Sequence, residues 1–155
     1  MRPESRGKRF ALLVAQFYPE IAARLEDGAR RALQACGASE SDILRFEVPG
    51  CFELPLAARN AIAADPGLDA VVALGAVIRG ETAHFDLIAH ECARGLMDVQ
   101  LSTGVPVGFG VLTTESMEQA NARAERDGRD KGFEAAMAAA QMVATYGGAC
   151  GKRSC

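Results

Sequence analysis

Short and almost continuously apolar segments alternate with longer amphipathic segments along this chain. The apolar runs occupy residues 9–16, 43–48, 69–78 and 106–113. A run of this length without polar alternation is typical of a strand buried on both faces. After each run the apolar residues recur at helical spacing, as at Ile21, Leu25 and Ala29. The pattern therefore predicts strands that are each followed by one or two helices.

This order of elements determines the class of fold. Strands that alternate with helices form a parallel sheet, because each connection has to cross the sheet and its helix covers one face. Right-handed crossovers leave few topologies, and a doubly wound one is the simplest. We expect an α/β fold, namely a flavodoxin-like three-layer α/β/α sandwich whose four-stranded parallel sheet is covered on both faces.

The limits of the helices are marked by residues with known preferences. Pro19 and Pro55 each stand where a first helical turn would tolerate proline. Ser116 and Gln119 have the spacing of a capping box. The expected helices span residues 19–36, 52–64, 84–103, 117–126 and 131–146.

Length, charge and cysteine usage limit the class of protein. The 155 residues fit one domain, 1–155, in which we expect 1–8 and 147–155 to be flexible tails. A net charge of −3 with interspersed signs offers no broad basic surface for nucleic acid. The longest apolar run is far shorter than the ~20 residues that a bilayer requires, and the polar N-terminus shows no signal peptide. The five irregularly spaced cysteines favour free thiols in a reducing cytoplasm.

Ligands of doubly wound sheets bind beyond the carboxyl ends of the strands. We expect residues 17–18, 50–53, 76–85 and 109–114 at that edge. Glu81 and Thr82 precede a helix start, whose free N–H groups can hold an anion. An ordinary turn with Thr82 as N-cap explains the same residues equally well. His84, in the first turn, can exchange protons near neutral pH or serve only as a surface histidine.

Further candidates at this edge are a thiol, a carboxylate and three aromatic rings. Cys51 precedes a helix start, a setting that can activate a nucleophile, although most such cysteines only pack. Glu53 can accept hydrogen bonds from a polyol, or can simply favour its helix N-terminus. Phe17, Phe52 and Phe109 can stack on a planar ring, but for Phe52 packing in the core is favoured. The spacing of the histidines and cysteines matches no metal motif, so no metal is assigned.

Four blocks of the chain resemble the 6,7-dimethyl-8-ribityllumazine synthase family, in the family's order. They are residues 48–55 (VPGCFELP), 75–86 (GAVIRGETAHFD), 106–114 (PVGFGVLTT) and 118–120 (EQA). The resemblance extends over about residues 9–146. It implies the penultimate step of riboflavin biosynthesis. The substrates would be 5-amino-6-(D-ribitylamino)uracil and 3,4-dihydroxy-2-butanone 4-phosphate, and the products the lumazine, phosphate and water, with no cofactor.

The resemblance implies that several segments bind the ribitylaminouracil. Phe17 would stack on the uracil ring. Residues 51–53 would line the pyrimidine and ribityl site, and residues 76–78 would offer backbone groups. A further phenylalanine would come from a neighbouring subunit. In chain order these residues are Phe17, Cys51, Phe52, Glu53, Ala76, Val77, Ile78 and Phe109.

The resemblance also implies a phosphate site and shared active sites. Glu81 and Thr82 would hold the phosphate of the butanone substrate, and His84 would transfer protons. Arg123 of a neighbouring subunit would pair with the phosphate, with Lys131 as a possible accessory. The expected assembly is therefore a homo-oligomer, a pentamer or larger, and riboflavin synthase is a further candidate partner.

Some positions depart from the family's pattern. Cys51 stands where Ser or Ala is common, and Tyr18 where Asn is frequent. Residues 124–130 are more charged than usual, which leaves the size of the assembly open. Two other functions remain: a flavin- or nucleotide-binding module without turnover, suggested by the fold and Phe17, and a hydrolase that uses Cys51 and His84.

Overall fold

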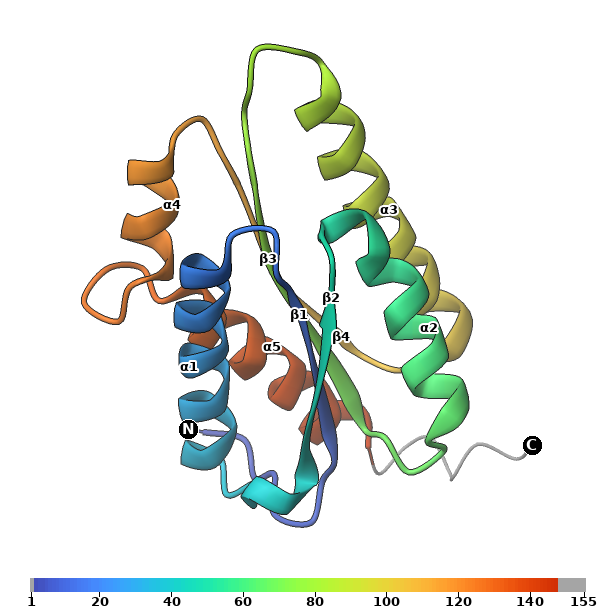
Figure 1. Ribbon diagram of the computed structural model, residues 1–155. Helices are drawn as coiled ribbons and strands as arrows, with labels where there is room; N and C mark the ends of the chain where they lie inside the picture. Colours follow the sequence, from blue (N-terminus) through green and yellow to red (C-terminus); the bar gives the residue numbers. More distant parts are fainter. Residues whose placement is uncertain (1, 148–155) are drawn as a thin grey trace.

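The computed structural model describes residues 2–147 and has the expected α/β architecture (Figure 1). The strands β1 (Phe10–Ala15), β2 (Ile43–Val48), β3 (Ala70–Ile78) and β4 (Val107–Thr114) form one sheet in the order β2-β1-β3-β4. Every neighbouring pair is parallel. This is the flavodoxin-like topology, so the predicted fold class is confirmed. Cys150, Cys155 and all but the first residue of the expected C-terminal tail lie outside the described residues.

Helices pack on both faces of the sheet. One face carries α1 (Pro19–Ala35), α4 (Met117–Ala124) and α5 (Lys131–Tyr146), and the other carries α2 (Leu54–Ala64) and α3 (His84–Thr103). Two short 3-10 turns, η1 (Glu40–Asp42) and η2 (Cys51–Glu53), precede β2 and α2. The α2 helix therefore begins two residues later than expected. At the N-terminus, the Ser5 backbone N–H donates to the carbonyl oxygen of Cys36 at 2.7 Å.

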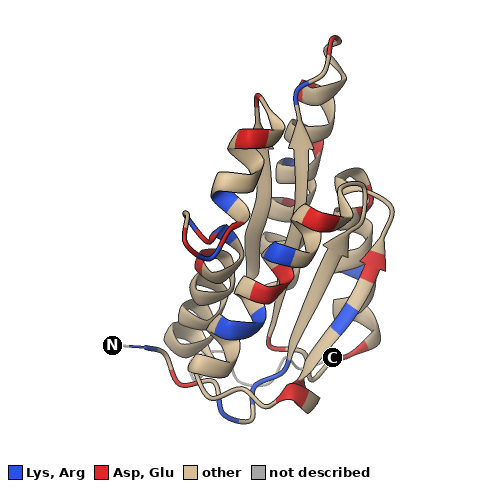
Figure 2. Ribbon diagram, turned by 60° about the vertical axis from the view of Figure 1, so that its left-hand side comes forward, with Lys and Arg blue, Asp and Glu red and all other residues tan. Residues whose placement is uncertain are grey.

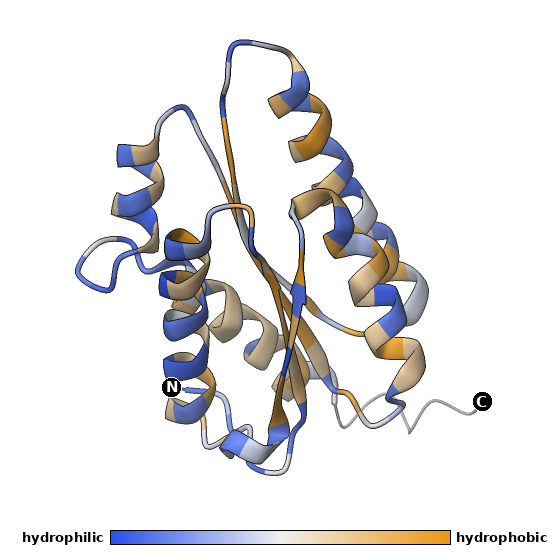
Figure 3. Ribbon diagram, viewed as in Figure 1, coloured by the Kyte–Doolittle hydropathy of each residue, from blue (hydrophilic) through white to orange (hydrophobic). Residues whose placement is uncertain are grey.

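The central strand β1 supplies side chains to two separate cores. Successive residues of a strand point to opposite faces. Leu12 and Val14 accordingly pack with α1 and α5, while Leu13 packs with α2 and α3. No residue of β1 is more than 2% exposed. Burial on both faces explains why the sequence of β1 is apolar throughout, a pattern that Figure 3 shows along β1 and β3.

The edge strand β2 departs from the expected burial. Arg45, Phe46 and Glu47 are exposed, and Phe46 retains 45% of its accessible surface. Arg45 forms an ion pair with Glu26 of α1 at 2.8 Å. Because β2 has a neighbouring strand on one side only, the flanking helices do not close over it. Helices therefore cover both faces of this strand only in part: Ile43 packs in one core and Leu44 and Val48 pack against the other.

The start of α4 is capped by side chains. Ser116 Oγ accepts a hydrogen bond from the Gln119 backbone N–H at 3.2 Å, as the predicted capping box requires. The Gln119 side chain, however, accepts from the N–H of Glu115 at 2.9 Å and not from that of Ser116. The helix ends at Ala124, two residues before the expected end.

The contact between α1 and α5 is unusually close. Figure 2 shows charged residues along the outward side of α1 and in the loop before α5. Arg31 of α1 donates to both carboxylate oxygens of Asp130, at 2.9 and 3.1 Å. Gly28 and Gly132 lie where the helices meet, and a Cβ on Gly132 would be 1.9 Å from the carbonyl oxygen of Leu25. Only glycine at position 132 allows this approach.

Candidate functional site

Three of the predicted segments meet at the carboxyl edge of the sheet. The strands β1 and β2 end at the same level, since Ala15 pairs with Val48 and the Gln16 N–H donates to the Val48 carbonyl at 2.9 Å. Phe17 follows β1 directly, and η2 follows β2. The loop from β3 to α3 leaves the same edge (Figure 1).

At this edge β3 extends beyond β1. The β1–β3 pairing ends at Val14 and Leu74, whereas the β3–β4 pairing continues to Ile78 and Thr114. Residues 76–78 therefore have no strand beside them on the β1 side. The chain order also reverses between β1 and β3, and doubly wound proteins bind ligands at such a switch point. The Val71 and Arg79 N–H groups donate to the β4 side, so by alternation Ala76 and Ile78 turn their backbone groups to the side that β1 leaves open.

Two aromatic rings flank this switch point with much of their surface open. Phe17 is 71% exposed and Phe52 is 59% exposed. The expectation that Phe52 packs in the core is wrong, because η2 buries Cys51 and the following Leu54 and leaves Phe52 outside. Glu53 is also exposed. A planar ring and a polyol could therefore contact these side chains directly.

Cys51 lies beneath the edge as a packing residue. A Cβ on Gly75 of β3 would be 2.7 Å from its sulfur, and the thiol belongs to the same core as Cys92 of α3. The interaction with Cys92, together with burial, raises the pKa of the Cys51 thiol. A nucleophilic cysteine has to be a thiolate. The structure therefore argues against a hydrolase that uses Cys51 and His84.

The loop between β3 and α3 presents Glu81, Thr82 and His84, all exposed. Thr82 Oγ1 accepts a hydrogen bond from the His84 backbone N–H at 3.3 Å. The N-cap of α3 is Ala83, so Thr82 stands one residue before the N-cap position considered for it. The N–H groups and the positive dipole end of this 20-residue helix meet the loop. The arrangement suits a bound anion.

Arg79 belongs to this site in a way that the sequence analysis missed. Its guanidinium is 2.8 Å from the carboxylate of Glu115 and 3.3 Å from that of Asp86. The guanidinium carbon also lies 4.4 Å from the ring centroid of Phe85. The sequence does contain a signal for this contact: the basic Arg79 stands just before the loop, and the acidic Asp86 stands in the first turn of the helix after it.

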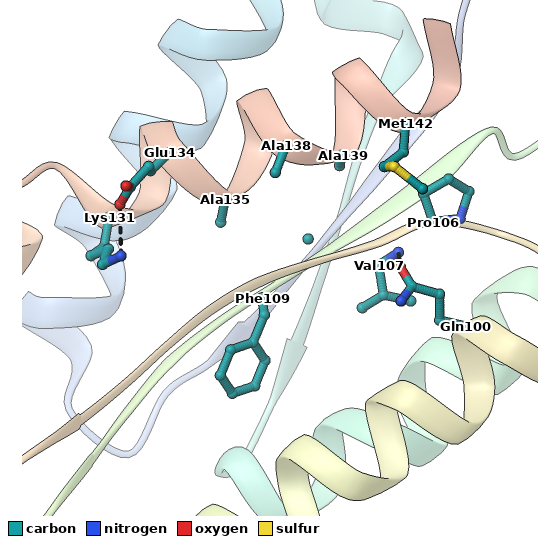
Figure 4. A pocket seen from close by; sticks show the side chains of 11 residues that line it. Gln100, Pro106, Val107, Phe109, Lys131, Glu134, Ala135, Ala138, Ala139 and Met142 are labelled. Carbon is teal, nitrogen blue, oxygen red and sulfur yellow. Dashed lines mark hydrogen bonds and ion pairs between the residues drawn. The ribbon is translucent and has the colours of Figure 1, made fainter. Parts of the chain in front are cut away.

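Phe109 does not lie at the carboxyl edge, so the expectation that all of residues 109–114 lie there is wrong. It pairs with Ala73 and precedes Thr114 by five residues, or roughly 16 Å along the strand. Its ring is 47% exposed and lies on the face of the sheet opposite α5, because a Cβ on either neighbour, Gly108 or Gly110, would meet α5. Phe109 and Lys131 both line the pocket between β4 and α5 that Figure 4 shows. The Lys131 ammonium is 2.7 Å from the carboxylate of Glu134.

Arg123 belongs to α4, the helix that follows β4. It stands in the last turn of α4, and its guanidinium donates to the carbonyl oxygen of Gln119 at 3.1 Å. The candidate residues of one chain thus form two groups. We call Phe109, Arg123 and Lys131 the β4-side group. The carboxyl-edge group contains Phe17, Cys51, Phe52, Glu53, Ala76, Val77, Ile78, Glu81, Thr82 and His84.

Neither a metal cluster nor a membrane helix is found in residues 2–147. No three His, Cys, Asp or Glu side chains in this range are grouped so that they could hold a metal ion. No helix in the same range is both long and apolar enough to cross a bilayer. The cysteines described, Cys36, Cys51 and Cys92, are free and buried.

Known proteins share most of this sequence. The family model described as 6,7-dimethyl-8-ribityllumazine synthase matches residues 7–146. A relative of that name from Chlorobium phaeobacteroides is 48% identical over 92% of this chain and 91% of its own length. Another, from Desulfotalea psychrophila, is 49% identical over 88% of both chains, and one from Syntrophus aciditrophicus is 46% identical over 90% of both. The chain therefore belongs to the 6,7-dimethyl-8-ribityllumazine synthase family and is an enzyme of riboflavin biosynthesis.

Proposed function

We propose that this chain condenses 5-amino-6-(D-ribitylamino)uracil with 3,4-dihydroxy-2-butanone 4-phosphate to give 6,7-dimethyl-8-ribityllumazine, phosphate and water. The observation that supports it is the grouping of an exposed ring, an anion-binding loop and an imidazole around one switch point. Both substrates mixed with the purified chain should yield the absorbance and fluorescence of the lumazine. A rate no higher than the uncatalysed condensation would contradict the proposal.

The ribitylaminouracil occupies the part of the site between β1 and β3. The exposed Phe17 ring stacks on the pyrimidine, as aromatic faces do on planar heterocycles. Backbone groups of residues 76–78 hydrogen-bond the uracil on the side of β3 where the pairing with β1 has ended. Glu53 accepts hydrogen bonds from the ribityl hydroxyls. Phe52 and the backbone of Cys51 line the same side, so the Cys51 side chain itself is not needed for binding.

The butanone phosphate occupies the part of the site at the start of α3. Its phosphate dianion is held by the helix N-terminus, the Thr82 hydroxyl and the backbone near Glu81. Arg79 lies just before this loop, but two carboxylates already occupy its guanidinium. Arg123 of a neighbouring chain supplies a second guanidinium, which pairs strongly with phosphate oxygens.

His84 moves the protons of the reaction. The 5-amino nitrogen attacks the ketone carbon and gives a carbinolamine, which loses water to form an imine. Phosphate then leaves, the resulting enol tautomerises, and the ribitylamino nitrogen closes the second ring with loss of water. Each step adds or removes a proton at nitrogen, oxygen or carbon, which one positioned imidazole can serve in turn. Holding both substrates together supplies much of the remaining acceleration.

The complete site lies between two chains. Phe109 is roughly 16 Å from the end of β4, so it cannot reach a ring bound beside Phe17 of its own chain. Its ring is about half exposed and is therefore accessible to a neighbouring chain. A head-to-tail contact between the two groups is heterologous and closes into a ring. We propose a homo-oligomer, a pentamer or larger, in the cytoplasm, with riboflavin synthase as the partner that consumes the product.

Loss of a residue that binds the phosphate should weaken the binding of the butanone phosphate only. In Thr82→Val or Arg123→Ala, one charge-assisted hydrogen bond of roughly 1.5–3 kcal/mol disappears. The KM for the butanone phosphate should rise about ten- to a hundred-fold, while the KM for the uracil stays close to wild type. Steady-state kinetics with each substrate varied in turn measures both values. An equal rise in the two KM values for Arg123→Ala would contradict the phosphate assignment.

Two impaired variants should restore part of each other's activity if the site is shared. His84→Ala damages the carboxyl-edge group and Arg123→Ala damages the β4-side group. Chains of both variants, unfolded and refolded together, should form some sites from two intact groups and recover part of the activity. Each variant refolded alone is the control. No recovery in mixed oligomers verified by mass spectrometry, or a fully active monomer, would overturn the shared site.

A further inference from the structure

Arg79 joins the end of β3 to two other elements. Its backbone N–H donates to the carbonyl oxygen of Thr114 at 2.9 Å, which holds its main chain at the end of the β3–β4 pairing. The side chain then reaches Glu115, before α4, with 2.8 Å between Nε and a carboxylate oxygen. It also reaches Asp86, in the first turn of α3, at 3.3 Å. One side chain thus connects β3, α3 and the segment before α4.

An aromatic contact adds to these ion pairs. The guanidinium carbon is 4.4 Å from the centroid of the Phe85 ring, a distance at which a cation is attracted to the ring face. Phe85 is half-buried and packs on the core between the sheet, α2 and α3. The contact therefore extends from Arg79 into the packed interior and fixes the direction of the first turn of α3.

The loop that follows has few other connections to the sheet. Within the described residues, its hydrogen bonds run forward into α3: the His84 N–H donates to Thr82 at 3.3 Å, and the Asp86 N–H donates to the Ala83 carbonyl at 3.1 Å. The fully buried residues of α3 lie at least two turns later, at Cys92, Leu96 and Val99. In Figure 1 the loop and the first turn project beyond the other elements of this edge.

We propose that Arg79 is a positioning residue, which holds the 80–83 loop so that Thr82 and His84 meet the phosphate-bearing substrate in the productive geometry. This role rests on the proposed function. The negative charges of Asp86 and Glu115 together exceed the positive charge of Arg79. A phosphate dianion would have to displace both carboxylates to bind the guanidinium directly. The contacts therefore favour positioning over direct phosphate binding.

Only arginine can make these contacts together. Its planar guanidinium offers several fixed donors and a face that stacks on an aromatic ring, whereas lysine has a single ammonium. Exposed ion pairs contribute little to global stability. Removal of Arg79 should therefore change the geometry of the loop and leave the fold intact.

Kinetics of matched arginine variants tests the role. In Arg79→Ala, kcat/KM for the butanone phosphate should fall at least about tenfold, because small displacements of reacting groups are costly. The KM for the uracil should stay near wild type, and Arg79→Lys should restore only part of the loss. Arg94→Ala removes another exposed arginine of α3, paired with Asp98 at 3.6 Å, and should have wild-type kinetics. Wild-type kinetics in Arg79→Ala would overturn the proposal.

The carboxylate partners separate positioning from direct binding. If Arg79 positions the loop, Glu115→Gln should lower kcat/KM for the butanone phosphate, as Arg79→Ala does. The double variant should then be little worse than Arg79→Ala alone, because one contact network is lost in both. If Arg79 binds the phosphate directly, Glu115→Gln frees the guanidinium and should lower the KM. A lower KM would overturn the positioning role.

Hydrogen exchange tests the loop without any substrate. The backbone amides of residues 80–86 should exchange faster in Arg79→Ala than in wild type, while amides of the later turns of α3 stay unchanged. Arg94→Ala should not alter exchange in the loop. Unchanged exchange in Arg79→Ala would overturn the positioning role, whereas a wild-type chain that makes no lumazine would overturn the proposed function.

Discussion

Replacing His84 with alanine should lower kcat by about a hundredfold or more, the usual contribution of a general acid–base group. His84 is the first residue of α3. Its backbone N–H donates a hydrogen bond to the Thr82 hydroxyl at 3.3 Å. The substitution removes the imidazole and leaves that backbone bond in place. The remaining rate comes from holding the substrates together, so activity should persist above the uncatalysed reaction.

The same helix provides a matched control for this prediction. His90 is also exposed, lies on α3 and belongs to neither candidate group. His90→Ala should therefore keep the wild-type kcat, measured under saturating concentrations of both substrates across neutral pH. A His84→Ala enzyme with the wild-type kcat at every pH would remove His84 from the mechanism.

Of all the variants proposed, Gly132→Ala should lower the free energy of unfolding the most. The new Cβ would lie 1.9 Å from the carbonyl oxygen of Leu25 and 2.7 Å from its carbonyl carbon. These are backbone atoms of α1, so the clash is relieved only if α1 and α5 move apart. Overpacking of this kind costs about 1–3 kcal/mol or more, which exceeds the ~0.5–1 kcal/mol that alanine gains over glycine in a helix.

Thermal unfolding at a fixed protein concentration measures this effect. In a domain of this size each kcal/mol lost lowers the midpoint by about 2–4 °C, so a fall of several degrees is expected. Gly80→Ala is the matched control for stability, because a Cβ there meets no atom within 4 Å. A Gly132→Ala midpoint equal to that of Gly80→Ala would show that α1 and α5 are not in close contact in solution.

Local sequence patterns were enough to predict the sheet and its helices. The apolar residues of β1 and β3 are buried on both faces, so no polar alternation interrupts them, and the strands stand out from the amphipathic helices between them. Right-handed crossovers then leave little choice of topology. Pro19, Pro55 and Ser116 mark helix starts by preferences that depend only on nearby backbone. The carboxyl-edge segments followed from this topology.

Other features depended on contacts between distant residues. Phe52 and Cys51 are neighbours in the sequence, yet a single 3-10 turn exposes the first and buries the second. The position of Phe109 depends on how far β4 runs, which is set by its pairing with β3.

The sequence by itself determined the family, the parallel sheet and the identity of the candidate residues, because these depend on residue types and on their spacing along the chain. Only the tertiary structure divided those residues into a carboxyl-edge group and a β4-side group, left the edge strand β2 open, and brought Arg79 to Glu115, 36 positions further along the chain. The physical reason is that strand register and helix packing are set by burial across the whole core. They decide which distant side chains become neighbours.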